Sequence, residues 1–188
     1  MTAARLMPHT HNVYRVLARR HTMSEDASYS QTRRDNRWNT PDFPALYACC
    51  SLAVARSVAN DLFSRSGVVL EDLQPDALPV LHELGWRGEL VDAATPAGLA
   101  TAGLPSAYPT GVTKADTQRA ASTWHAAAFE GVVCRSASLA RLGFAQWTQP
   151  HEPWGEVAIF TRNAKRPVRR ERTWIDLAWL RAPSTEVS

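Results

Sequence analysis

DNRWNTPDFPALYACC, residues 35–50, carries the strongest structural signal in this 188-residue chain. Pro41 and Pro44 exclude a helix there, because proline cannot donate the backbone hydrogen bond that a helix interior needs. The apolar run Ala45–Cys49 that follows predicts a buried strand. The polar segment from His21 to Pro44 predicts a long loop, and loops of this length in compact domains tend to carry function.

Helices and further strands are predicted on both sides of this strand. Apolar residues recur at helical spacing from Leu52 to Leu62, with Ser51 as a suitable N-cap and Gly67 as the end of the helix. The alanine-rich stretch Lys114–Phe129 contains no Pro or Gly and predicts a second helix. Strands are predicted at Val13–Leu17, Val68–Leu73, Gly131–Arg135 and Glu156–Phe160, with a last, edge strand at Arg172–Leu180.

The segment 75–111 is harder to assign. Its five prolines predict a crossing connection with short helices, among them a weak helical fragment at Val80–Leu84. Strands and helices alternate without a strict βαβ rhythm, and the sequence has no glycine-rich phosphate loop. We therefore expect an α/β (α+β) fold, a mixed β-sheet with helices packed on it.

Length and composition indicate one domain over residues 1–188. The chain is 45% apolar, as in ordinary globular proteins. No apolar run approaches the ~20 residues that span a bilayer, and the N-terminus lacks the apolar core of a secretion signal, so a cytoplasmic protein without membrane contact is expected. The three cysteines, Cys49, Cys50 and Cys134, fit neither a disulfide framework nor a zinc pattern, and we expect them to be reduced and buried.

The net charge of +3 is unevenly distributed, because basic residues crowd the segment 162–172. A solvated turn between two strands is the favoured interpretation of this segment, since no aromatic residue interleaves with the charges before Trp174. Nucleic-acid binding through the segment is the less favoured alternative, and it would weaken steeply with salt.

An ordered set of motifs resembles the RES domain family. The set comprises Tyr14-Arg15, then residues 35–50, then GVVCRSAS at residues 131–138, and the resemblance extends over a core of about residues 13–160. It implies an ADP-ribosyltransferase-like fold and action on NAD⁺ as substrate, without a metal: hydrolysis, phosphorolysis or transfer of ADP-ribose. It also implies a toxin held inactive by a helical Xre-type antitoxin.

The resemblance assigns roles to particular residues. Arg15 matches the early arginine of the family, Arg37 the arginine of its Arg-Trp-Asn stretch, Tyr47 the strand tyrosine and Ser136 the serine. Asn36 stands where the family usually has glycine, so the backbone there is expected to differ.

The chemistry of these residue types agrees with that assignment. Paired guanidinium groups bind a pyrophosphate bidentately, and an aromatic face suits the flat cationic nicotinamide ring. A serine can hydrogen-bond the nicotinamide ribose or amide. Structural roles stay open for each residue: an ion pair of Arg37 with Asp35 or Asp42, a solvated strand edge for Arg15, a core position for Tyr47, and a backbone hydrogen bond for Ser136. Trp38 is expected to anchor the core.

The family carboxylate is missing. A carboxylate stabilises the positive charge that builds on ribose when the nicotinamide bond breaks. The family glutamate lies eleven residues after the strand tyrosine, where this chain has Val58. Asp61 is the nearest carboxylate on the same helix, ~4.5 Å further along the axis, and is a weak substitute. Glu130 and Glu152 are further carboxylates without a motif.

Two hypotheses follow. The first is an NAD⁺-consuming RES-type toxin, and the second is a catalytically weakened RES domain that binds a nucleotide or a partner protein. His125 lacks partners at catalytic spacing and is expected to be a partly exposed helical histidine. No metal site is expected among His9, His11 and His21, because no cysteine or paired aspartate accompanies them.

Overall fold

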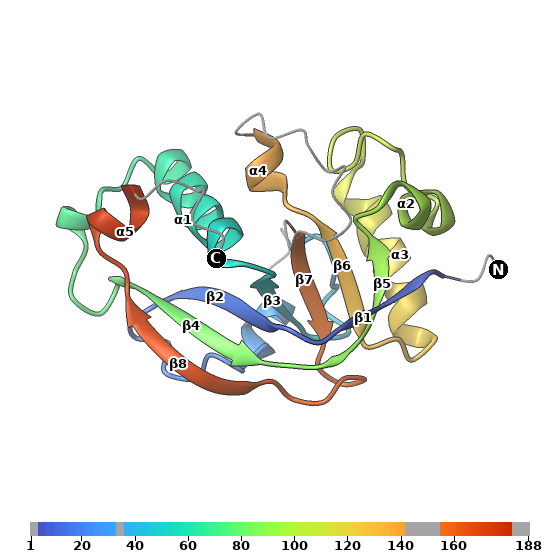
Figure 1. Ribbon diagram of the computed structural model, residues 1–188, viewed down its shortest axis with the longest axis horizontal. Coiled ribbons are helices and arrows are strands. Elements are labelled where there is room, and N and C mark those ends of the chain that lie inside the picture. The colour runs from blue at the N-terminus through green and yellow to red at the C-terminus, as the bar shows by residue number, and fades with distance from the viewer. Residues whose placement is uncertain (1–3, 33–35, 142–154, 182–188) are drawn as a thin grey trace.

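The computed structural model describes residues 4–32, 36–141 and 155–181 (Figure 1). Their strands form one eight-stranded sheet in the order β1-β5-β6-β7-β3-β2-β4-β8. The pair β5–β6 is parallel and the other neighbours are antiparallel, which confirms the predicted mixed sheet. The strands are β1 (Leu6–His9), β2 (Asn12–Ala18), β3 (Ala45–Cys49), β4 (Pro79–Gly85), β5 (Gly88–Ala93), β6 (Gly131–Arg135), β7 (Gly155–Phe160) and β8 (Val168–Trp174).

The described helices lie between these strands in the sequence. They are α1 (Leu52–Ser66), α2 (Pro96–Ala102), α3 (Lys114–Ala126), α4 (Ala137–Arg141) and α5 (Leu177–Arg181), together with the short 3₁₀ helices η1 (Ser28–Thr32) and η2 (Leu70–Asp72). Helix α1 begins and ends as predicted, because Ser51 accepts a hydrogen bond from the Val54 N–H at 3.3 Å and Gly67 adopts a left-handed φ of 64°. No helix among the described residues is long and apolar enough to cross a membrane.

Three predicted elements are wrong or partly wrong. Val68–Leu73 forms no strand; its central part is η2, and Val68 and Val69 are exposed. Val80–Leu84 is not helical but part of β4, because it pairs along its whole length with β2. The last predicted strand ends early: β8 stops at Trp174 and the chain then turns into α5, although β8 does lie at the sheet edge.

The helices cover one face of the sheet, which we call the helix-bearing face (Figure 1). Two apolar clusters lie under them. The α2–α3 cluster includes Leu99, Trp124, Val132 and Ala158, and the α1–α4 cluster includes Cys49, Val54, Leu81 and Leu139. The sheet's other face carries a third cluster, which includes Val13, Leu46, Leu84 and Leu90 and is covered in part by Ala27 of the long loop.

Candidate functional site

Three of the four polar side chains that the motifs single out, Arg37, Tyr47 and Ser136, gather on the helix-bearing face between the two apolar clusters. Tyr47 points to this face from β3, since alternate residues Ala45, Tyr47 and Cys49 all belong to the clusters of that face. The Tyr47 hydroxyl accepts a hydrogen bond from the Trp38 N–H at 2.8 Å and donates one to Asn39 Oδ1 at 2.9 Å. Burial raises the pKa of Tyr47, so the phenol stays protonated and cannot act as a base near neutral pH.

The turn that carries Arg37 is fixed from several sides. Gln118 of α3 donates hydrogen bonds to the carbonyl oxygens of Asn36 and Asn39, at 2.8 and 3.2 Å. Trp38 is 2% exposed and stacks on Trp124 with ring centroids 5.7 Å apart, which confirms it as a core anchor. The neighbours of Arg37 therefore hold its backbone in place, and none of these contacts uses the Arg37 side chain.

Arg37 itself is half-buried and faces the site. Its guanidinium hydrogen-bonds the Tyr108 hydroxyl and lies close enough to Glu156 to lower the pKa of that carboxyl. The structural alternative for Arg37 is an ion pair with Asp35 or Asp42. Of these two, Asp35 lies outside the described residues. The contacts of Arg37 are thus directed at the helix-bearing face.

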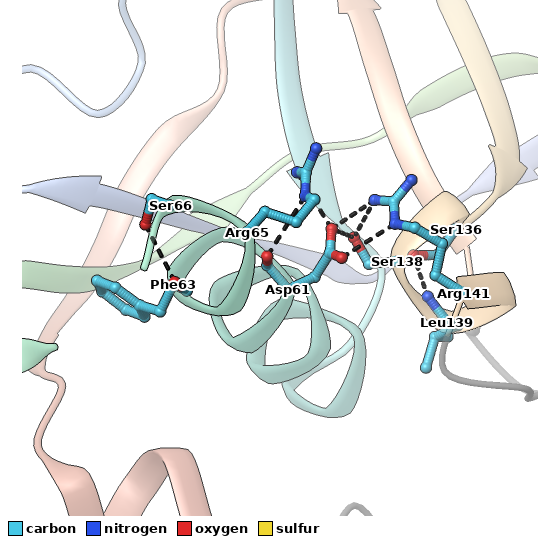
Figure 2. Close-up of polar contacts among 8 residues, drawn as sticks. All are labelled: Asp61, Phe63, Arg65, Ser66, Ser136, Ser138, Leu139 and Arg141. Atoms are coloured by element: carbon cyan, nitrogen blue, oxygen red, sulfur yellow. Dashed lines mark hydrogen bonds and ion pairs between the residues drawn. The ribbon is translucent and has the colours of Figure 1, made fainter. Parts of the chain in front are cut away.

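Ser136 is fully buried at the end of β6. Its hydroxyl accepts a hydrogen bond from the Leu139 N–H at 3.3 Å and so caps the first turn of α4 (Figure 2). The same hydroxyl hydrogen-bonds the carboxylate of Glu156. Ser136 therefore has both a backbone partner and a partner in the site.

Glu156 is a site residue that sequence reasoning missed. It lies on β7 directly between Cys49 of β3 and Cys134 of β6, and it shares the helix-bearing face with Ala158. Burial raises the pKa of Glu156, while hydrogen bonds from Ser136 and the Ala137 N–H oppose the shift, as does Arg37. A charged residue within the otherwise apolar run of β7 was the available signal.

Asp61 lies in a neighbouring set of ionic contacts between α1 and α4 (Figure 2), and Arg141, which binds it, also acts on Glu156. Its carboxylate accepts hydrogen bonds from Arg141, with Nε at 2.9 Å, and from the Ser138 hydroxyl at 3.0 Å, and it pairs with Arg65 at 3.1 Å. These contacts, that of Arg141 above all, lower the pKa of Asp61. Val58, at the family glutamate position, packs against the α1–α4 cluster.

Arg15 lies on the sheet's other face, because it alternates with Tyr14 and Val16, which pack against the α1–α4 cluster. It is 3% exposed and donates hydrogen bonds to the carbonyl oxygens of Ser24 and Asp26, at 2.5 and 2.8 Å. The two arginines therefore do not converge. Nor is Arg15 a solvated strand-edge charge, since it fastens the long loop to the sheet.

His125 and Glu130 make their contacts outside this cluster. His125 stacks on Phe43 with ring centroids 4.2 Å apart. Glu130 accepts a hydrogen bond from the Glu89 N–H at 2.6 Å, and Glu152 lies outside the described residues. The three cysteines are buried and free, as predicted. Among the described residues, no group of three or more His, Cys, Asp or Glu side chains is placed to hold a metal ion.

The basic segment 162–172 is a solvated turn only in its first part. Arg162 donates to the Asp42 carbonyl at 3.0 Å and Arg169 to the Thr22 carbonyl at 3.0 Å, so both contact the long loop. From Val168 onward the segment belongs to β8, every residue of which is exposed.

Comparisons with known proteins agree with the fold. The family model for the RES domain matches residues 12–179. The crystal structure of the M. tuberculosis MbcT–MbcA toxin–antitoxin complex contains a similar chain, with a TM-score of 0.72 and 16% sequence identity over 93% of this chain and 89% of that one. No curated protein matches the sequence. The structural likeness extends over nearly the whole of both chains, so the two share a fold.

Proposed function

Because this chain belongs to the RES domain family, we propose that it is the toxin of a toxin–antitoxin pair and that it breaks the bond between nicotinamide and ribose in NAD⁺. One observation carries the proposal. Three residues of the matched motifs, Arg37, Tyr47 and Ser136, reach the helix-bearing face and surround one half-buried carboxylate, Glu156.

Each of these residues has a definite task in such a site. The planar guanidinium of Arg37 binds the pyrophosphate with charge-assisted hydrogen bonds. The Tyr47 ring packs on the nicotinamide riboside, and its orientation is set by the hydroxyl contacts with Trp38 and Asn39. Ser136 holds the carboxylate of Glu156 rather than the substrate, because it is fully buried.

A second candidate function is a binding module that holds a nucleotide without cleaving it. Two observations favour it: Val58 is an apolar side chain in an apolar cluster, and the Asp61 carboxylate is occupied by Arg65, Ser138 and Arg141. Neither position offers a free carboxylate to a ribosyl cation.

The decisive experiment follows NAD⁺ loss over time with purified protein, with and without phosphate. We expect the unmodified protein to consume NAD⁺ and Arg37→Ala to lose about 10- to 100-fold in kcat/KM, the value of one or more hydrogen bonds to a charged group. Arg119→Ala is the matched control, because Arg119 is an exposed arginine of α3 paired with Asp116. Product analysis distinguishes ADP-ribose from its phosphorylated form.

The outcomes separate the two candidates. Binding of NAD⁺ without its loss, together with new consumption by Val58→Glu, supports the binding module and overturns the toxin chemistry. Equal activity of Arg37→Ala and Arg119→Ala would remove Arg37 from the site.

The partner is proposed on the same basis. The similar chain in the solved structure is described as one member of a toxin–antitoxin complex. We infer that a helical antitoxin of the Xre type binds this protein. Co-expression with the product of a small neighbouring gene is expected to yield a stable complex in which NAD⁺ loss is suppressed, and two separately purifying proteins would contradict the inference.

A further inference from the structure

The candidate site has an arginine and a tyrosine in family positions but no carboxylate at the family position, because Val58 stands there. Resting on the function proposed above, we propose that Glu156 of β7 is the catalytic carboxylate of this protein. In this chain the carboxylate would then come from the sheet rather than from helix α1.

The position of Glu156 is the first argument. It lies on a central strand, opposite Cys49 of β3 and Cys134 of β6, so it is surrounded by sheet on both sides. It faces the same side as Tyr47, whose strand neighbour in the register is Ala158, two residues further along β7. Two residues along a strand restore the same face.

The contacts of Glu156 are the second argument. Ser136 and the Ala137 N–H fix the carboxylate by hydrogen bonds, and the guanidinium of Arg37 lies nearby. Asp61 differs in this respect, since two arginines and Ser138 occupy its oxygens and join α1 to α4. Among the described residues, no arginine forms an ion pair with Glu156 as Arg65 and Arg141 do with Asp61. A carboxylate held in this way can stabilise a cation that develops on the substrate.

The surrounding charges suit that task. Burial is the largest influence on Glu156 and raises its pKa, and Arg37 and Arg141 oppose the shift. Burial also raises the pKa of the three neighbouring thiols, which are therefore neutral at physiological pH. The ionisable groups that interact electrostatically with Glu156 are Arg37, Tyr47, Cys49, Cys50, Cys134 and Arg141.

The chemical step balances without a further reagent. The bond between ribose C1′ and the nicotinamide nitrogen breaks, and its electron pair leaves with nicotinamide, which departs as a neutral base. The Glu156 carboxylate stabilises the positive charge that develops at C1′. A water molecule then adds to C1′ and passes its proton to Glu156, which returns it to solvent.

The test compares Glu156→Gln with the unmodified protein and with Glu89→Gln, an exposed glutamate of β5. Glutamine keeps the shape of the side chain and can still accept the hydrogen bonds of Ser136 and Ala137. We expect kcat to fall about 100-fold or more, as for loss of an electrostatic stabiliser. NAD⁺ affinity measured by titration should change less than about threefold, because the binding contacts remain.

Two further variants keep the test decisive. Glu156→Asp retains the charge but withdraws it by one methylene, and it should keep partial activity even where Glu156→Gln unfolds. Ser136→Ala removes a hydrogen bond that favours the charged carboxylate, so the pKa of Glu156 should rise. The acidic limb of the kcat–pH profile should therefore move to higher pH, a change that a purely structural serine would not cause.

The failures can be told apart. If the unmodified protein leaves NAD⁺ intact, the proposed function fails, and the role of Glu156 fails with it. If the unmodified protein consumes NAD⁺ and a folded Glu156→Gln variant does so equally well, only the assignment of Glu156 is overturned.

Discussion

Asp61 and Glu156 show how surroundings decide the role of a carboxylate. Arginines and a hydroxyl bind Asp61 directly, and its pKa is lowered, so it is a fixed anion. Glu156 lies among strands, where burial raises its pKa more than Arg37 and Arg141 lower it. The first arrangement suits a structural tie between helices, and the second suits a group that exchanges a proton or meets a cation.

Asp61→Ala should therefore lower stability. The change removes the contacts of α1 with Arg141 and Ser138 of α4. We expect a loss of about 1–2 kcal/mol in the free energy of unfolding, below the value for a fully buried pair because both arginines are partly exposed. Urea unfolding measures it, and Asp76→Ala, an exposed aspartate, is the control. Unchanged stability with lost NAD⁺ consumption would instead place Asp61 in the chemistry.

At the scale of single elements, helices begin where a side chain caps the first backbone N–H groups. Helix α3 begins with a capping box in which Thr113 and Asp116 hydrogen-bond each other's backbone N–H groups. Thr95 is the N-cap of helix α2, and its hydroxyl accepts a hydrogen bond from the Gly98 N–H at 3.1 Å. Asp92 of β5 accepts hydrogen bonds from the N–H groups of Ala94 and Thr95, which joins the strand to the helix.

Gly98 marks the closest approach of α2 to β5. A methyl group at this position would overlap the carboxyl group and the carbonyl oxygen of Asp92. Gly98→Ala should therefore destabilise the protein by about 1–3 kcal/mol through overpacking, even though alanine favours helices by about 1 kcal/mol. Thermal or urea unfolding tests this, with Ala97→Ser on the exposed side of α2 as control. A rise in stability would show that Asp92 and its strand can move aside.

In the molecule as a whole, the two faces of the sheet carry different kinds of residues. The helix-bearing face combines two apolar clusters with the polar site between them. The other face holds Arg15 and, next to it on β4, His82, which is 0% exposed and has no hydrogen-bond partner for either ring nitrogen among the described residues. Burial lowers the pKa of His82 to about 4, and Arg172, Arg169 and Arg15 contribute to the shift.

Because the pKa of His82 is lowered, we expect the free energy of unfolding to fall in acid. Above pH 6.5 His82 is neutral in both states and has no effect. As the pH falls from 6.5 toward 4, the unfolded chain takes up a proton that the folded chain refuses, so the free energy of unfolding falls. The full loss, below pH 4, is about 3 kcal/mol.

Urea unfolding at several pH values between 8 and 4.5 measures this loss. His82→Leu should flatten the pH dependence relative to the unmodified protein, whereas His11→Gln, at an exposed histidine, should leave it unchanged. Identical pH profiles for the His82→Leu variant and the unmodified protein would mean that His82 is protonated equally in both states.

Local sequence was sufficient for much of the fold. The strands at Ala45–Cys49 and Gly131–Arg135 and the helix after Ser51 are predicted and confirmed, because alternation, capping and helix-ending glycines act within a few residues of each other. The motif resemblance likewise selected Arg37, Tyr47 and Ser136, which do share one face.

The rest depended on contacts between distant segments. Val80–Leu84 is a strand because β2, more than sixty residues earlier in the chain, and β8 pair with it on its two sides. Arg15 and Tyr47 point to opposite faces because a strand alternates its side chains and the register sets which ones face the helices. Glu156 meets Ser136 only when β6 and β7 pair. Local residue patterns do not encode strand pairing across such separations, so tertiary packing alone places this carboxylate in the site.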